Sequence, residues 1–176
     1  MKKLLSIALA CGLLINLTSC KTANKEEAKV PDGMMALDLS KFGKSFIIFI
    51  PDSTKGKVEV TEQSWGALEI KVGQDFQISI KEGDEDLAFK KTDLQGDEIN
   101  KVKQFHVDEP TTLLWESVIG EGTPEFHFIS VQKVGNAAYT FEDIKSTDNK
   151  PFTKAAVDKM LESVKGITPT KKEENS

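Results

Sequence analysis

Two histidines, His106 and His127, are the residues of this chain best suited to metal binding or to acid–base chemistry near neutral pH. In an extended segment His127 shares a face with Glu125, because side chains two residues apart in a strand point the same way. If the residues around His106 are also extended, His106 shares a face with Asp108. Two such strands lying side by side would offer two imidazoles and two carboxylates, which is a zinc-like set of ligands.

A simpler interpretation of the two histidines is also open. No HxH or HxxxH spacing places two imidazoles on one element in advance. One histidine would then lie at the surface, and the other would be packed and hydrogen-bonded within the fold. We therefore assign no metal ligand and expect no cofactor from the sequence.

Nucleophilic catalysis is not indicated by any motif. Ser64, Ser117 and Ser130 lack the flanking glycines of a GxSxG turn, and there is neither a GxGxxG nor a phosphate-loop lysine. The 28 acidic residues leave open a pair of carboxylates of the glycosidase type. Because no catalytic motif is present in the sequence, we expect no catalytic activity. The alternative is a hydrolase that uses dispersed carboxylates, or a metal enzyme built on His106 and His127.

The charge of the chain excludes nucleic acid as a main partner. All 23 basic residues are lysines, and the 28 acidic residues bring the formal net charge to −5. Without arginine the chain lacks the planar fork that grips phosphates and carboxylates through two hydrogen bonds. A net negative surface also repels the phosphate backbone.

The N-terminus has the features of a targeting segment. Met1-Lys2-Lys3 is positively charged, and Leu4 to Leu17 is an apolar run shorter than the ~20 residues that span a bilayer. Together they predict a secretory signal peptide over residues 1–19 that is removed from the mature protein.

The end of this run, Leu17-Thr18-Ser19-Cys20, resembles the lipobox of bacterial lipoproteins. The resemblance implies that diacylglycerol is attached to the sulfur of Cys20 and that cleavage occurs just before it. The membrane would then be a partner through this lipid. Lys21 at the next position favours the bacterial outer membrane in the sorting rule of enterobacterial lipoproteins. The alternative is a periplasmic protein cleaved nearby, with Cys20 incidental.

The remaining cysteine and the chain ends fit this organisation. Cys11 lies in the segment expected to be removed, so we expect no internal disulfide. Residues 20–32 are predicted to be a lipid anchor and a flexible polar tether, and residues 33–167 a single domain long enough to bury its own core. Residues 168–176 are predicted to be a polar tail.

The domain is predicted to be α+β, with a largely antiparallel sheet of about six to seven strands and two helices packed on it. One helix opens near Asp84-Glu85-Asp86, and the other is capped by Thr153 and closed by Gly166. Residues 97–108 fit a helix or a strand, and the pattern does not decide between them. The segments expected to be strands are 45–50, 57–61, 68–72, 76–80, 113–119, 125–134 and 138–143.

Residues 45–167 look like small uncharacterised bacterial lipoproteins and are distantly similar to the Mog1/PsbP-like α/β/α sandwich. The segments that carry this resemblance, among them DEPTTLLWES and EFHFISVQKVGNAAYTFED, are hydrophobic patterns rather than chemical motifs. No functional residue carries over from it. We expect a membrane-tethered, non-enzymatic binding or assembly module of the cell envelope, with a protein or a small ligand as its partner.

Overall fold

The computed structural model of this chain describes residues 30–145 and 150–170. Within these residues the fold is α+β, with a seven-stranded sheet, a three-stranded sheet and two α-helices, one mid-chain and one C-terminal. Neighbouring strands in both sheets pair antiparallel. The predicted fold class is therefore confirmed. The predicted signal peptide, Cys11 and Cys20 lie outside the described residues.

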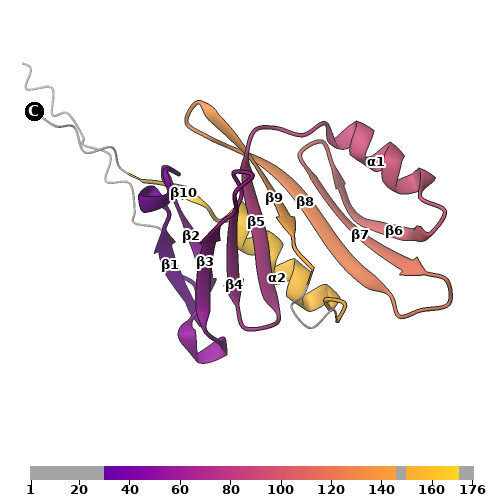
Figure 1. The fold of residues 1–176 in the computed structure, drawn as a ribbon, viewed down its shortest axis with the longest axis horizontal. Helices are drawn as coiled ribbons and strands as arrows, with labels where there is room; N and C mark the ends of the chain where they lie inside the picture. The colour runs from indigo at the N-terminus through magenta and orange to yellow at the C-terminus, as the bar shows by residue number, and fades with distance from the viewer. Residues whose placement is uncertain (1–29, 146–149, 171–176) are drawn as a thin grey trace, which may run out of the picture.

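The larger sheet has the strand order β3-β4-β5-β9-β8-β7-β6 (Figure 1). Its strands are β3 (Val58–Glu62), β4 (Leu68–Val72), β5 (Phe76–Glu82), β6 (Asn100–Glu109), β7 (Thr112–Ile119), β8 (Glu125–Val134) and β9 (Ala137–Asp143). The smaller sheet has the order β1-β2-β10, with β1 (Met34–Asp38), β2 (Phe46–Pro51) and β10 (Thr168–Pro169). The helices are α1 (Leu87–Gly96) and α2 (Lys154–Lys165), and short 3-10 turns cover Ser40–Phe42 and Ser53–Lys55.

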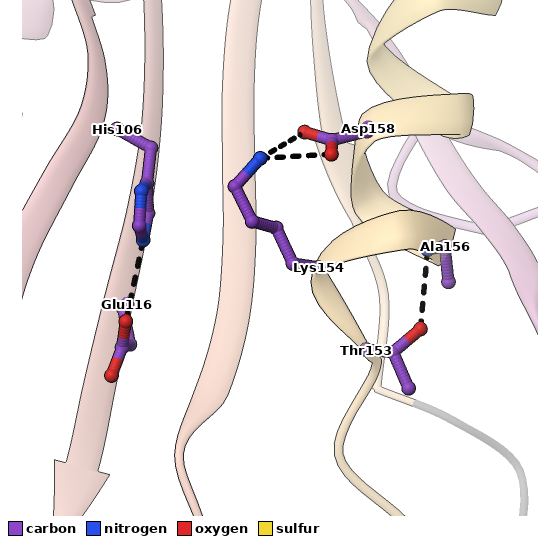
Figure 2. A network of polar contacts seen from close by, with 6 residues as sticks. All are labelled: His106, Glu116, Thr153, Lys154, Ala156 and Asp158. Atoms are coloured by element: carbon purple, nitrogen blue, oxygen red, sulfur yellow. Dashed lines mark hydrogen bonds and ion pairs between the residues drawn. The ribbon is translucent and has the colours of Figure 1, made fainter.

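The two helices begin at capping residues that the sequence supplies. The Asp86 side chain accepts hydrogen bonds from the backbone N–H groups of Ala88 and Phe89 at the start of α1. Thr153 accepts one from the N–H of Ala156 at the start of α2, as Figure 2 shows. Both caps satisfy N–H groups that have no partner inside the helix. None of the described helices is long and apolar enough to cross a bilayer.

Two hydrophobic cores lie on opposite faces of the larger sheet. Leu114 belongs to the main core with α2, whereas its neighbour Leu113 belongs to a smaller core with Leu87 of α1. Adjacent residues in a strand point to opposite faces, so α1 and α2 cover opposite faces of the sheet. Helix α2 buries Val157, Met160, Leu161 and Val164 in the main core.

The smaller sheet packs its central strand against the same core as α2. Phe46 of β2 contacts Tyr139 edge to face, with the ring centroids 5.0 Å apart, and its ring also lies near that of Phe141. Because both partners are on β9, β2 and α2 share one face of the larger sheet.

Three details differ from the sequence analysis or complete it. Strand β1 has no counterpart among the predicted strands, and residues 97–108, which were undecided, form most of strand β6. Thr168 and Pro169, predicted to begin a polar tail, instead pair with Ile47 and Phe46 of β2. The fold therefore extends to Thr170, whose N–H donates to the carbonyl of Ser45.

Candidate functional site

The candidate site lies at the N-terminal end of β8, where His127 contacts Asp143 of β9. The Nδ1 atom of His127 is 2.8 Å from the Oδ2 atom of Asp143. The other carboxylate oxygen, Oδ1, accepts a hydrogen bond of 2.7 Å from the backbone N–H of Phe128. The Asp143 side chain is only 6% exposed. Two hydrogen bonds therefore fix this buried carboxylate, and the carboxylate fixes the orientation of the imidazole ring.

The second nitrogen of His127 faces a different carboxylate. Its Nε2 atom lies 3.6 Å from the Oε2 atom of Glu125, as expected for two residues on one face of a strand. The ring also contacts the indole of Trp115, with centroids 5.4 Å apart. Within the described residues, Nε2 is buried and has no hydrogen-bond partner.

Two more buried polar atoms without a partner stand on the neighbouring strand β7. These are Nε1 of Trp115 and Oγ of Ser117, again within the described part of the chain. Trp115 pairs with His127 across the sheet, and Ser117 pairs with Glu125. Since most buried polar groups in proteins are hydrogen-bonded, three such atoms in adjacent positions mark this region as unusual.

A hollow of about 280 Å³ opens beside His127. It is lined by Glu125, His127, Asp143, Lys145, Lys150, Pro151 and Phe152. The lining carries both signs of charge around one imidazole, with the buried Phe152 as its apolar wall. The shape and the groups suit a small polar ligand or a metal ion more than a large apolar one.

The surroundings of His127 favour its protonated form. Burial of the ring lowers its pKa, but the hydrogen bond and charge of Asp143, with a smaller contribution from Glu125, outweigh burial. The pKa of His127 therefore lies above its ordinary value. A histidine in this state donates from both nitrogens, and it becomes a ligand only when Nε2 loses its proton.

His106 lies on the opposite face of the sheet. Its Nε2 atom is 3.3 Å from the Oε2 atom of Glu116 (Figure 2). Its ring lies against that of Phe126. Glu116 and Phe126 are the direct sequence neighbours of Trp115 and His127, so they point to the other face. Strand β7 also separates β6 from β8.

The predicted two-histidine set is therefore not formed. Asp108, expected to join it, instead pairs with Lys91 of α1. In residues 30–145 and 150–170 no group of three or more histidines, cysteines and acidic residues is placed to hold a metal. What the sequence analysis did place correctly is Glu125, on the same face as His127 and within reach of it.

The three serines considered as nucleophiles are scattered. Ser64 is exposed in the turn between β3 and β4, and the Ser130 hydroxyl pairs with that of Thr112. Ser117 is close to the site, but its hydroxyl and Nε2 of His127 both lack a hydrogen-bond partner within the described residues, so they do not bond to each other. A Ser–His–Asp hydrogen-bond chain is therefore not assembled.

Trp115 is in the core, with 7% of its surface exposed, whereas Trp65 is 57% exposed. The Lys81 ammonium lies 5.2 Å from the Trp65 ring centroid, a cation–π contact. A second and wider hollow of about 510 Å³ lies between the start of α1 and the β6–β7 turn, where Lys91 and Asp108 meet.

The chain matches no protein-family model, no curated protein and no solved structure.

Proposed function

We propose that this chain is a bacterial lipoprotein, anchored to the membrane through a lipid on Cys20. The observation that carries the proposal is the sequence Leu17-Thr18-Ser19-Cys20, which ends an apolar run preceded by two lysines. One acyl chain holds a protein to a bilayer only marginally, at roughly 0.8 kcal/mol per buried methylene. The three chains that the lipoprotein family carries would make the attachment effectively permanent.

The folded body is proposed to be a binding or assembly module held in the cell envelope. The hollow beside His127 supports this role, because it brings a fixed imidazole, two carboxylates and two lysines to one concave place. A protein partner or a small polar ligand of the envelope would bind there. Lys21, directly after the proposed lipidated cysteine, supports placement in the outer membrane.

The alternative is an envelope hydrolase or a metal-binding enzyme. It would have to work without joint use of His106 and His127, since these lie on opposite faces of the sheet. Two carboxylate–imidazole pairs in the described residues are within hydrogen-bond distance across neighbouring strands, His127–Asp143 and His106–Glu116. Of these two, the pair of His127 and Asp143 lines the hollow. Hydrolysis of an envelope ester or amide that is lost in His127→Ala would favour this alternative.

The anchor is tested by changing each cysteine alone. Cys20→Ala should abolish incorporation of radiolabelled palmitate and leave the precursor uncleaved, because no thioether can form. Cys11→Ala is the matched control, since it changes a cysteine in the apolar run before Cys20 and should leave labelling and mature mass unchanged. Equal labelling of both variants, or an unchanged mature mass in Cys20→Ala, would overturn the proposal.

The placement in the outer membrane is tested separately, by changing Lys21, the residue after Cys20. In a host that follows the enterobacterial sorting rule, Lys21→Asp should move the protein from the outer-membrane to the inner-membrane fraction. Lys21→Asn keeps a polar residue without the acid and should leave it in the outer membrane. Fractionation of the parent chain with the inner membrane would contradict the placement but not the lipid anchor.

A further inference from the structure

We propose that His127 acts as a proton-controlled latch for the carboxylate of Glu125. With a proton on Nε2, the imidazole holds Glu125 as an ion pair at 3.6 Å. Without that proton, Nε2 accepts a hydrogen bond from the hydroxyl of Ser117 on β7, and Glu125 is released toward solvent. The latch is a property of the folded domain, so it stands independently of the proposed lipid anchor.

The Nε2 atom of His127 is shielded from water. It is buried, and within the described residues it has no hydrogen-bond partner. An imidazole nitrogen donates a hydrogen bond when it carries a proton and accepts one when it does not. Because a buried polar group without a partner costs free energy, each protonation state needs its own partner from the protein.

Glu125 is the partner of the protonated state. It lies two residues before His127 on β8, so the two side chains share one face of the strand. The separation of 3.6 Å is longer than a hydrogen bond, so the contact is an ion pair that depends on the charge of the ring. The Glu125 side chain is 35% exposed, so water can solvate it once the ring is neutral.

Ser117 is the partner of the neutral state. It pairs directly with Glu125 across β7 and β8, which places its hydroxyl beside the space between Nε2 and the carboxylate. Ser117 is fully buried, and its Oγ atom has no hydrogen-bond partner in the described part of the chain. A hydroxyl rotates to suit the acceptor beside it. Since this hydroxyl is closed to solvent, the bond would order side chains and would not make Ser117 a nucleophile.

The indole of Trp115 is less suited to this role. Its Nε1 atom also lacks a partner within residues 30–145 and 150–170. Trp115 lies opposite His127 itself, however, whereas Ser117 lies opposite Glu125, the residue toward which Nε2 points. The direction of an indole N–H is fixed by its ring, and this ring already contacts the imidazole ring.

Asp143 restricts the change of protonation to Nε2. Its carboxylate is bound to Nδ1 of His127 at 2.8 Å, and the N–H of Phe128 holds that carboxylate in place. The neutral ring therefore keeps its proton on Nδ1 and presents its lone pair at Nε2. Burial lowers the pKa of His127, but Asp143 and Glu125 outweigh burial and raise the pKa above 6.5. The latch is closed below the folded pKa and opens as pH rises through it.

The latch changes the charge of the hollow beside His127. At low pH three positive groups oppose two carboxylates there, and at high pH two positive groups oppose two. These groups are His127, Lys145, Lys150, Glu125 and Asp143. The neighbours of the ring on β7, Trp115 and Ser117, are uncharged. An anionic ligand of the hollow would therefore bind more tightly in acid, a consequence that rests on the binding role proposed above.

NMR titration of the two histidines tests the latch. The full chain contains only His106 and His127, so in mild detergent it gives two Cε1–H signals, which His127→Gln assigns. Each signal yields a titration midpoint when the pH is varied from about 5 to about 9. His106, which contacts Glu116, is the internal control in every spectrum.

Two variants should move the His127 midpoint in opposite directions. Glu125→Gln removes the partner of the protonated ring and should lower the midpoint. Ser117→Ala removes the partner of the neutral ring and should raise the midpoint by about 0.4–1 pH unit, the equivalent of one net hydrogen bond. Ser130→Ala is the matched control, since it changes a fully buried serine on the other face of the sheet, bonded to Thr112, and should leave the midpoint unchanged.

Three results would overturn the latch. A Glu125→Gln midpoint equal to that of the parent would show that the ring does not hold the carboxylate. This result is decisive even where Ser117→Ala fails to fold, because Glu125 is partly exposed. A midpoint in folded Ser117→Ala that is equal to or below the parent's would show that the hydroxyl does not replace Glu125. An equal change at His106 would reveal a general effect of charge. No ligand is added, so these results are separate from whether the hollow binds one.

Discussion

His127 and Asp143 are 16 residues apart in the sequence, yet the Nδ1 atom of one lies 2.8 Å from the Oδ2 atom of the other. Asp143 also accepts the N–H of Phe128, so a single buried carboxylate serves the side chain of one residue and the backbone of the next. This contact links the N-terminal end of β8 to Asp143, the last residue of β9.

The raised pKa of His127 predicts that this residue stabilises the fold mainly in acid. A histidine whose pKa rises on folding contributes stability below its unfolded pKa of about 6.5, and that contribution is lost as pH rises through the folded pKa. The parent should therefore exceed His127→Gln in melting temperature most at about pH 5 and least at about pH 9. Glu125 and Asp143 contact the ring, and Lys145 and Lys150 line the hollow beside it. Melting curves that differ equally at all pH values would contradict this.

Removal of the Asp143 carboxylate should destabilise the domain. Asp143→Ala leaves the N–H of Phe128 and Nδ1 of His127 without their acceptor, at a cost of about 1–3 kcal/mol in the free energy of unfolding. Asp158→Ala is the control, because it removes a half-exposed carboxylate paired with Lys154 and should cost less than about 1 kcal/mol. Urea denaturation measures both, and equal losses would show that Asp143 acts only as surface charge.

The buried face of α2 is tested by two adjacent positions. Leu161→Ala empties a buried leucine site and should lower the free energy of unfolding by roughly 2–5 kcal/mol. Glu162→Ala changes the next residue, which is exposed, and should stay within about 0.5 kcal/mol of the parent. A negligible loss in Leu161→Ala, measured by urea denaturation, would contradict the packing of α2 on the sheet.

Gly56 and Gly73 meet where the turn after β2 crosses the β4–β5 turn. A Cβ atom on Gly56 would lie 2.5 Å from the Cα of Gly73, and the φ of Gly56 is +150°. Gly56→Ala should therefore destabilise the domain by more than about 1 kcal/mol. Gly96→Ala, where a Cβ meets nothing within 4 Å, should be neutral or slightly stabilising because alanine favours a helix. A similar melting temperature for both variants would count against the close approach.

Chelation should leave the stability of the full chain unchanged. The main core, with Phe46, Phe76, Phe128 and Phe141 almost fully buried, supplies the apolar burial that a domain of this size needs. The melting temperature with EDTA should therefore match that without it. A large decrease that zinc restores would mean that a metal holds the fold together.

The regular elements of the fold could be predicted because their hydrophobic periods agree with their structure. Leu68, Ile70 and Val72 alternate with polar residues and are buried in β4, and Thr153 caps α2 as the pattern indicates. Strand β6 could not be decided, because register shifts interrupt its pairing with β7 between Val102 and Gln104 and again between Phe105 and Val107. Each shift breaks the two-residue alternation.

Two strands were missed for identifiable reasons. β1 is an edge strand with mostly exposed residues, so no alternation marks it. Pro169 in β10 lacks the N–H of a regular strand residue, and proline argues against a strand except at an edge.

The partner of His127 was also missed, although the sequence held a signal for it. The two-residue turn Gly135-Asn136 pairs Val134 with Ala137, and counting back along both strands brings Phe128 opposite Asp143. The hydrogen bond to His127 itself depends on how the Asp143 side chain turns, which no pattern reports. The separation of His106 from His127 likewise required the strand order, since nothing in the sequence shows that β7 lies between them.

The irregular pairing of β6 also affects how copies of the domain behave at high concentration. An open strand edge is a template on which another chain can add a strand, and long flat edges lead to aggregation. β6 is an edge of the larger sheet, but its two register shifts bend its backbone, and Lys101 and Lys103 on it are exposed. Copies crowded together would repel one another at this edge, so β6 should resist the strand addition by which a regular edge strand joins neighbours into fibres.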